Sequence, residues 1–441
     1  MSSSIRYRCL GSALWLVVTM VTALAAADFE DQDYITREVC IVGGGSTGTY
    51  AAVQLQDQGH SVVVVEQKSR LGGHAETEYY PDGFINYGVA GVFGNQLTKN
   101  YLERLGTGKK VAPNPNNLGF GEAAALYLNA IKQYNFTSEG TYDLPQPVPE
   151  ELLRPFGEFV QKNRLEGALP LIFTFASGVG NILETPLLYV LQNFGIAHIN
   201  ALLSGYITPK EGLADIYKKA AAAIGPSNIL YQTLVVEARR SEDGGINLVV
   251  QSADGCQKMI KAKKLLITMP PTMKNMGPFD LDAKEKSLFR KWHWQNYYAA
   301  IVNDSGIPND LQVSNLDPSQ PNSLPVPPFQ WSLEYMGVPG YLASKIIAGP
   351  DFTADEAKDL VVSDIRRMKG TYPIQDPEIV AFADHTPTSM KVSAEDVRNG
   401  FYTRLYALQG QKSTYYTGLS FCSDYSSLLW AYTEKIIAQM F

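Results

Sequence analysis

The chain has 441 residues, of which 45% are hydrophobic and 18% are charged, and its formal net charge at pH 7 is −7. That length is enough for two or three domains with a sizeable core, and the acidic balance argues against nucleic acids and anionic membrane surfaces as partners. One of the four cysteines, Cys9, is close to the N-terminus; the other three make no disulfide framework. No cysteine spacing resembles a metal site and the five histidines are scattered, so we expect no metal site.

The N-terminal residues 1–27 are predicted to be a signal peptide. Arg6 and Arg8 precede an uncharged run that ends in three alanines before Asp28. A basic start, an apolar stretch and a small-residue cleavage site are typical of secretory signals. The alternative is a signal-anchor helix, for which the run is of marginal length. We expect no membrane span beyond this segment.

Two N-x-S/T triplets begin at Asn135 and Asn303. Such triplets are acceptors for glycans in the secretory pathway, although they also arise by chance. Together with the signal peptide they predict a glycoprotein that is secreted or retained in the lumen of the endoplasmic reticulum.

A dinucleotide-binding pattern occupies residues 39–66. An apolar run leads into a G-x-G-x-x-G turn, a helix-like segment follows, and a second apolar run ends on Glu66. Glycines in such a turn let backbone N–H groups approach a pyrophosphate at the helix N-terminus, and the acid accepts hydrogen bonds from ribose hydroxyls. The predicted cofactor contacts are Gly43, Gly45, Ser46, Thr47, Gly48, Glu66 and Gln67.

A second glycine pair, Gly72-Gly73, follows the ribose acid closely, and nicotinamide-dependent dehydrogenases have no need of one there. With the segment GFINYG at residues 83–88, the sequence resembles the flavin-containing amine oxidase superfamily. Asn86 stands where that superfamily usually has Asp, and His74 where amine oxidases usually carry Arg. The resemblance implies FAD as the cofactor, while the two departures weaken the case for a true amine oxidase. The contacts that it implies here are Arg70, Gly72, Gly73, His74, Gly88 and Val89.

The resemblance also assigns roles in two later segments. A predicted β-hairpin over residues 229–251 would offer the backbone of Val235 to the adenine. Near the C-terminus, Gly418 would lie at the flavin ribityl chain, where Leu419 replaces the usual acid. The helix predicted over residues 426–439 would direct its N-terminus, with Ser427, at the pyrimidine ring of the flavin.

The predicted fold class is therefore α/β, with a Rossmann-type FAD-binding domain of the glutathione-reductase and amine-oxidase kind. Three segments would form it, residues 36–110, 205–280 and 396–441. An α+β substrate-binding domain would consist of residues 111–204 and 281–395, with the active site between the two domains.

A closer resemblance covers nearly the whole mature chain. LGGHAETEY, FINYGVAGVFGN and the C-terminal segment STYYTG look like the fungal β-cyclopiazonate dehydrogenase family. That resemblance implies an FAD-dependent oxidoreductase of fungal secondary metabolism. Such an enzyme abstracts a hydride from an activated C–H bond of a terpenoid or alkaloid intermediate, with oxidative ring closure. The alternatives are a flavin amine oxidase that releases hydrogen peroxide and a non-catalytic flavin-binding protein.

Aromatic residues on two predicted strands suit a flat, apolar natural product as the small-molecule substrate. The expected substrate contacts are Trp292, Trp294, Phe329 and Trp331. Lys291 precedes the first of these strands, and no lysine lies within it, which argues against ordinary amine oxidation. His385 and His293 are the candidate catalytic bases, with a structural histidine as the alternative for each. The sequence predicts no particular oligomeric state.

Overall fold

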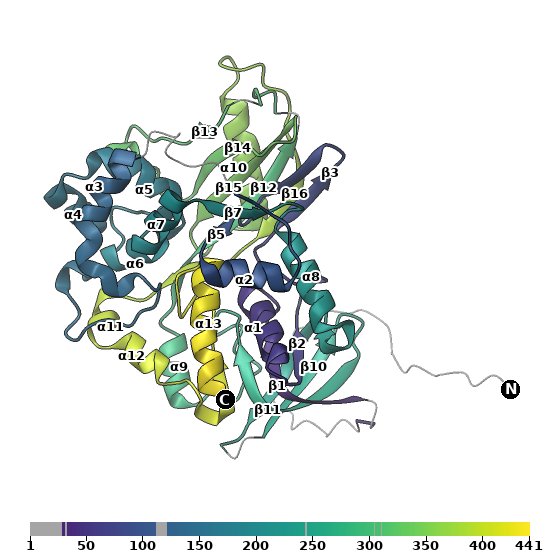
Figure 1. Cartoon of the computed structure of the whole chain (residues 1–441). Helices are drawn as coiled ribbons and strands as arrows, with labels where there is room; N and C mark the ends of the chain where they lie inside the picture. Colours follow the sequence, from purple (N-terminus) through teal and green to yellow (C-terminus); the bar gives the residue numbers. More distant parts are fainter. Residues whose placement is uncertain (1–28, 31–32, 112–120, 243–244, 304, 310) are drawn as a thin grey trace.

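The computed structural model describes residues 29–30, 33–111, 121–242, 245–303, 305–309 and 311–441. The predicted signal peptide, residues 1–27, lies outside the described residues. Figure 1 shows two large sheets at opposite ends of the molecule, with a group of helices beside them. The predicted α/β fold class is confirmed.

The first sheet has the strand order β8-β2-β1-β11-β10-β9, and β18 also pairs with β11. Its strands are β1 (Tyr34–Val42), β2 (Val62–Val65), β8 (Ile229–Leu230), β9 (Thr233–Arg240), β10 (Ile246–Ser252), β11 (Gln257–Ile267) and β18 (Thr414–Tyr416). β8, β2, β1, β11 and β18 run parallel, whereas β9 and β10 form an antiparallel hairpin on β11. Continuous apolar runs such as Val62–Val65 fit this position because a parallel sheet is buried on both faces.

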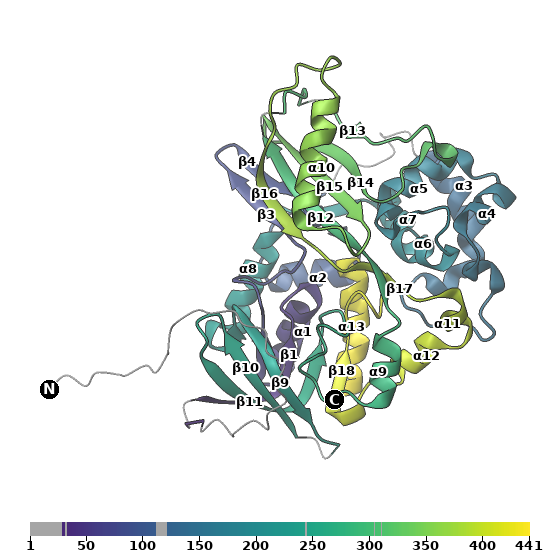
Figure 2. The ribbon, with the colours of Figure 1, turned by 180° about the vertical axis from the view of Figure 1, so that it is seen from behind.

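Three helices pack side by side against this sheet, as Figure 1 shows: α13 (Ser426–Met440), α1 (Ser46–Asp57) and α8 (Ala214–Ile224). α1 and α13 share an aromatic contact in which the rings of Tyr50 and Trp430 stack at 5.5 Å. The hairpin of β9 and β10 lies on the other side of the sheet (Figure 2). The carboxyl ends of β1, β2, β11 and β18 meet at one edge, where ligands of α/β sheets bind.

The second sheet has the order β13-β14-β15-β12-β16, with β17 paired to the start of β12. Its strands are β12 (His293–Asn303), β13 (Val313–Ser314), β14 (Phe329–Tyr335), β15 (Tyr341–Ala348), β16 (Glu378–Asp384) and β17 (Thr388–Lys391). Helix α10 (Ala354–Arg367) covers one face, where Val361 packs with Tyr298 and Val302. The other face, which we call the inner face, turns toward the hairpin of β3 (Thr77–Tyr80) and β4 (Gly83–Asn86), where Ile85 meets Ala299.

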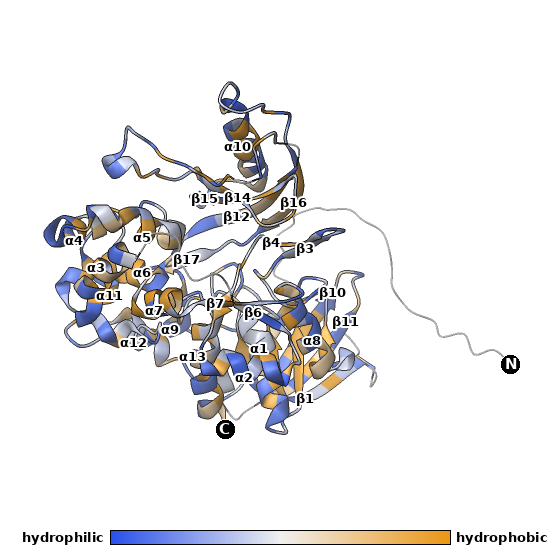
Figure 3. Cartoon of the chain, turned by 45° about the horizontal axis from the view of Figure 1, so that its top comes forward, coloured by the Kyte–Doolittle hydropathy of each residue, from blue (hydrophilic) through white to orange (hydrophobic). Residues whose placement is uncertain are grey.

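The helices of residues 121–204, which lie between β2 and β8 in the sequence, form a separate group (Figure 1). They are α3 (Gly121–Ile131), α4 (Phe156–Asn163), α5 (Leu169–Ala176), α6 (Leu187–Asn193) and α7 (Ile196–Ser204). Figure 3 shows apolar residues concentrated on the inward sides of α5, α6 and α7. Among the described residues, only the stretch 187–204 has the length and composition of a membrane span, and 67% of it is buried inside the protein. It is divided into α6 and α7, as expected of core helices.

The remaining elements connect these bodies. They are β5 (Val92–Phe93), β6 (Lys109–Val111) and β7 (Tyr206–Pro209), which form a small sheet, and the helices α2 (Gln96–Arg104), α9 (Ala283–Phe289), α11 (Ala394–Arg398) and α12 (Phe401–Tyr406).

A fully buried arginine, Arg240 at the end of β9, connects the first sheet to the segment around α9. It pairs with Asp280 at 2.6 Å and with Glu285 of α9 at 2.7 Å, and it donates to the hydroxyl of Tyr416 in β18.

Candidate cofactor and substrate site

The first glycine turn leads from the end of β1 into α1. Gly43 has φ +107°, which an L side chain rarely adopts, and its carbonyl accepts a hydrogen bond from the Thr268 hydroxyl at 2.8 Å. Gly48 lies so close to the turn that a Cβ there would be 1.9 Å from the carbonyl oxygen of Gly43. The N-cap of α1 is Gly45, which has no side chain to satisfy the free N–H groups of the first turn. A helix N-terminus left in this state attracts an anion.

Glu66 lies directly beside this turn, at the end of β2. Its carboxylate accepts hydrogen bonds from the backbone N–H groups of Gly44 and Lys68, both at 2.6 Å. Burial raises the pKa of Glu66, while these N–H groups oppose the shift by stabilising the charged form. The carboxylate is held in place where a ribose would bind, as the sequence predicts. Gln67, the next residue, is exposed.

The second glycine pair forms a loop against the first turn. Gly72 pairs with Gly45 in an isolated bridge and donates its N–H to the carbonyl of Gly44 at 2.8 Å. Arg70 does not extend away from this loop: it donates to the carbonyls of residues 71, 73 and 75 and pairs with Glu76. Lys68 binds the same carboxylate at 3.1 Å. Burial would raise the pKa of Glu76, but His385 and the two cations outweigh it and hold the pKa at about 2.

The space at Gly45 tests whether a pyrophosphate fits. A Cβ built on Gly45 would meet no protein atom nearer than the Cα of Gly73, at 3.9 Å. The space in front of Gly45 therefore contains no protein atom, and the two glycine loops border it. Free N–H groups, an open approach to the backbone and a fixed ribose acid fit an FAD molecule.

The C-terminal segment completes this region. Gly418, with φ +108°, follows β18, and a Cβ there would lie 2.8 Å from the carbonyl oxygen of Thr268. The Ser426 hydroxyl at the start of α13 accepts from the Ser46 hydroxyl at 3.0 Å, so the N-termini of α1 and α13 meet. Ser427 is used inside the protein, where its hydroxyl accepts from the backbone N–H of Phe93 at 3.0 Å. The N-cap of α13 is Tyr425, without a capping side chain, so the first N–H groups of α13 are free.

Four further predicted contacts lie around the same edge of the first sheet. Val235 is in β9, two residues beyond Thr233, whose N–H donates to the carbonyl of Glu66. Thr47 is buried in the first turn of α1. Gly88 and Val89 run alongside His74, and the N–H of Val89 donates to the carbonyl of His74. The structure thus gathers the predicted cofactor residues at this edge, and their individual contacts stay predictions.

Two histidines stack beside the second glycine loop. The rings of His74 and His385 are 4.5 Å apart and nearly parallel. His74 retains accessible surface, whereas His385 is 2% exposed and stacks on its other side against Tyr297 at 5.7 Å. Burial lowers the pKa of both imidazoles. His385 therefore lies in a layer behind His74, and its assignment as a base stays a prediction. His293 is exposed at the start of β12.

A group of partly exposed side chains lies between the glycine loops and the second sheet. Five side chains in this region retain accessible surface: His74, Tyr297, Lys345, Asp424 and Tyr425. Several of them lie near one another, because the charges of Lys345 and Asp424 both act on the hydroxyl of Tyr297, and Asp424 acts on Tyr425. We call these five side chains the inner group.

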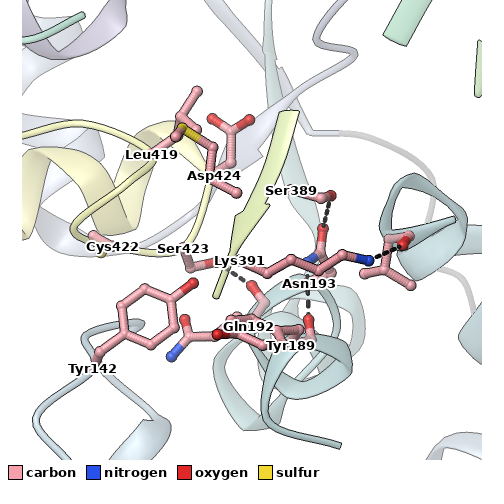
Figure 4. Close-up of a pocket in the computed structure, with 12 residues that line it drawn as sticks. Tyr142, Tyr189, Gln192, Asn193, Ser389, Lys391, Leu419, Cys422, Ser423 and Asp424 are labelled. Carbon is pink, nitrogen blue, oxygen red and sulfur yellow. Dashed lines mark hydrogen bonds between the residues drawn. The ribbon is translucent and has the colours of Figure 1, made fainter. Parts of the chain in front are cut away.

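Asp424 is the acidic residue of the inner group, on the side of α13. Burial raises the pKa of its carboxyl to about 6. Asp424 also borders a cavity that continues toward α6 and β17 (Figure 4). On the far side of that cavity, the ammonium of Lys391 points away from Asp424 and donates to the carbonyl of Val179 at 3.0 Å. Sequence reasoning missed Lys391, Lys345 and Tyr297.

The four predicted substrate contacts have different surroundings. Trp292 packs edge-on against Phe401 at 5.0 Å and is 5% exposed. Phe329 and Trp331 are on β14 and belong to the large core cluster, whereas Trp294 retains partial exposure. Little surface is left on the first three for a substrate, and their role stays a prediction.

The signal for Lys345 was present in the sequence, as a lone charge inside the apolar run YLASKIIA of β15.

A dinucleotide-binding edge with a second glycine loop, facing a separate sheet, is the arrangement expected of an FAD-dependent oxidoreductase. Residues 41–105 match the family model described as NAD(P)-binding Rossmann-like domain. The chain is 43% identical over 451 residues to the β-cyclopiazonate dehydrogenase of Aspergillus oryzae, covering 97% of this chain and 98% of that protein. It is 35% identical to the FAD-dependent oxidoreductase oblC of Cochliobolus heterostrophus, with 92% and 91% covered.

Two solved structures share the fold. The fatty acid isomerase from P. acnes that produces CLA has a TM-score of 0.73 at 19% identity, with 92% of this chain and 99% of that chain covered. Cyclohexylamine oxidase from Brevibacterium oxydans has a TM-score of 0.63 at 19% identity, with 92% and 98% covered.

The chain belongs to the family of FAD-dependent oxidoreductases that includes β-cyclopiazonate dehydrogenase. The resemblance inferred from the sequence is thereby confirmed, and so is FAD as the cofactor in preference to a nicotinamide. The enzyme is an oxidoreductase, which rules out the non-catalytic alternative.

Proposed function

We propose that this enzyme removes a hydride from an activated C–H bond of a terpenoid or alkaloid intermediate of fungal secondary metabolism, with oxidative ring closure. The observation that carries the proposal is the likeness to β-cyclopiazonate dehydrogenase along 97% of the chain.

FAD, when bound at the two glycine loops, would supply the two-electron chemistry by accepting the hydride. The carbon that loses it lies beside a nitrogen, an aromatic ring or an alkene, which delocalises the positive charge. A nucleophile of the same substrate then attacks this carbon. The nucleophile loses its proton as the new bond forms. The protein holds the two reacting groups together, which contributes up to about 7–11 kcal/mol in well-oriented cases.

Within the inner group, the phenol of Tyr297 and the carboxyl of Asp424 are the groups positioned to handle that proton. Asp424 suits the role because a base with a pKa of about 6 is mostly ionised at neutral pH and still basic enough to accept a proton. Tyr297 projects from the inner face of β12, the strand in which the sequence has no lysine.

The test is anaerobic mixing of the FAD-loaded enzyme with indole alkaloid and terpenoid intermediates, followed by mass spectrometry of the products. The expected result is bleaching of the flavin and a product two hydrogens lighter that contains a new ring. Reduction by simple amines alone, with release of hydrogen peroxide in air, would favour an amine oxidase instead.

A further inference from the structure

Of the two histidines stacked beside the second glycine loop, the inner one has a ring nitrogen without a hydrogen-bond partner. The rings of His74 and His385 are 4.5 Å apart, with an angle of 19° between their planes. Nε2 of His385 is buried and makes no hydrogen bond among the described residues. An oxygen of the Glu76 carboxylate is 3.8 Å from it, beyond hydrogen-bond distance. The stack is packed tightly here, because a Cβ built on Gly88 would lie 2.9 Å from Cε1 of His385.

Four charged side chains act on this histidine pair. They are the cations Lys68 and Arg70 and the carboxylates Glu76 and Asp384. Burial lowers the pKa of both histidines, and a proton on His385 would lower the pKa of His74 further. The two cations act in the same direction, whereas the two carboxylates oppose them. Since burial is the largest of these effects, the pair is uncharged at neutral pH in the protein without FAD.

The cofactor brings two negative charges to this region. Gly73, which precedes His74, borders the space in front of Gly45 in which the pyrophosphate fits, and its Cα is 3.9 Å from a Cβ built on Gly45. The four charged side chains around the pair, two positive and two negative, cancel one another and leave the diphosphate charge unbalanced. A nearby negative charge raises the pKa of an imidazole, because it favours the charged form.

We propose that the stacked pair of His74 and His385 takes up one proton from the solvent when FAD binds, and that Glu76 is the positioning residue for the resulting imidazolium. The pair takes one proton and not two, because two stacked imidazolium rings repel each other, so the titration belongs to the pair. A proton on Nε2 of His385 is directed at Glu76, and a proton on His74 lies toward the cofactor. No bond to FAD forms or breaks in this step. The inference rests on FAD as the cofactor and is independent of the proposed reaction.

Proton uptake makes the affinity for FAD depend on pH in one direction. The pKa of the pair is low in the protein without FAD and higher in the loaded enzyme, so between these two values only the loaded enzyme carries the proton. The affinity for FAD therefore rises as the pH falls through this window, by at most about tenfold per pH unit. We expect FAD to bind roughly three- to thirtyfold more tightly at about pH 6 than at about pH 8.

Two measurements on the full-length enzyme test the proposal. Nitrogen NMR of isotope-labelled histidine rings distinguishes imidazole from imidazolium, and the chain has only five histidines to assign. We expect one imidazolium in the pair at neutral pH with FAD bound, and none after FAD is removed. Fluorescence of the FAD that is released on dilution gives the dissociation constant at each pH. A pair that stays neutral with FAD bound would overturn the proposal, and so would an affinity that does not change with pH. If the flavin does not dissociate, the NMR measurement decides alone.

Variants separate proton uptake from a role in packing. The double variant His74→Gln/His385→Gln should lose the pH dependence of FAD affinity. Glu76→Gln should move this dependence to lower pH, because the carboxylate raises the pKa of both rings. If the double variant does not retain FAD, the Glu76→Gln result and the wild-type measurements still decide.

His60→Gln is the matched control. His60 also lies beside a carboxylate, that of Glu38 at 3.4 Å, but its ring stacks on Phe441 at the C-terminus. This variant should keep the pH dependence of the wild type. A dependence that disappears in His60→Gln and persists in the double variant would contradict the proposal.

ADP-ribose identifies the part of the cofactor that causes the uptake. It carries the adenosine and the diphosphate of FAD without the flavin. Its binding to the FAD-free protein should show the same preference for low pH. A preference that FAD shows and ADP-ribose lacks would contradict the assignment to the diphosphate and would place the proton at the flavin. None of these measurements requires turnover, so failure of the proposed reaction and failure of this inference are distinguishable.

Discussion

Two glycines of the first turn are needed for different reasons, one for cofactor binding and the other for packing of the backbone. Gly45 faces open space and has φ −67°, which alanine adopts without strain, whereas Gly48 touches the backbone of Gly43. We expect Gly45→Ala to change the free energy of unfolding of the apoprotein by no more than about 1 kcal/mol. The same variant should lose FAD, because its methyl group occupies the space that the pyrophosphate needs.

Gly48→Ala is the contrasting variant. Its Cβ would meet the carbonyl oxygen of Gly43 at 1.9 Å, so it should destabilise even the apoprotein by about 1–3 kcal/mol. Thermal melting of the apoproteins and the flavin absorbance of the purified variants measure both effects. An FAD-loaded Gly45→Ala enzyme would contradict the assignment of the pyrophosphate to this turn.

Asp424 makes stability depend on pH in a predictable direction. Its folded-state pKa is raised to about 6, above the ordinary value near 4 in the unfolded chain. Between these two values the folded protein binds more protons, so this group lowers stability as pH rises. The Asp424→Asn variant should therefore melt at the same temperature as the wild type at about pH 4, and at a higher temperature than the wild type at about pH 8. A difference of the same size at both pH values would contradict the raised pKa.

At the scale of elements, the buried arginine at the end of β9 holds the first sheet to α9 and to β18. Arg240→Met would leave Glu285 buried without its cation, and Asp280 would lose its partner. Breaking a buried pair from one side costs about 3–5 kcal/mol. Arg239→Met is the matched control, because the neighbouring arginine is exposed and pairs with Glu237 at the surface. We expect it to change the free energy of unfolding by less than about 1 kcal/mol in urea titration. Equal effects would show that the buried pairs contribute little.

Elements built on local signals could be predicted from the sequence. The strand, glycine turn and helix over residues 39–58 appear as β1 and α1, because the glycines and the apolar runs determine that geometry within a few residues. The predicted flavin contact of Ser427 stays a prediction, while the structure shows that Tyr425 is the N-cap of α13 and that the Ser427 hydroxyl accepts a hydrogen bond from the backbone of Phe93. Phe93 is distant in the sequence, so no local pattern could show this contact.

The residues of the inner group were harder to predict, for a related reason. Which face of β14 and β15 a residue occupies depends on the bulge between Gln330 and Ser332, which changes the register of the pair. Alternation along β14 suggested Phe329 and Trp331 as the substrate wall, whereas Lys345 on the neighbouring strand belongs to the inner group. His385 was noticed as a titratable group, but only the fold shows that His74 lies in front of it.

For the whole molecule, entry into the secretory pathway stays a prediction from the first 27 residues and two glycosylation triplets. Asn135 is exposed, while Asn303 is at the end of β12 and partly buried. Expressed in a fungal host, the mature chain should begin near Ala26 or Asp28 and carry a glycan at Asn135, since that site is the accessible one. Mass spectrometry before and after deglycosylation measures both, with Asn135→Gln as the control. An intact N-terminus without glycan would argue for residence in the cytosol.

The reaction of the whole enzyme should show its bond-breaking step directly. If a hydride leaves an allylic, benzylic or amine-adjacent carbon, deuterium at that carbon should slow anaerobic flavin reduction several-fold, whereas deuterium elsewhere should not. Small alkyl amines should be poor substrates, because each missing contact of methylene size forfeits about 0.8 kcal/mol of binding. Stopped-flow absorbance of the flavin measures both. Reduction by benzylamine or a polyamine as fast as by any indole alkaloid or terpenoid would replace the proposed reaction with amine oxidation.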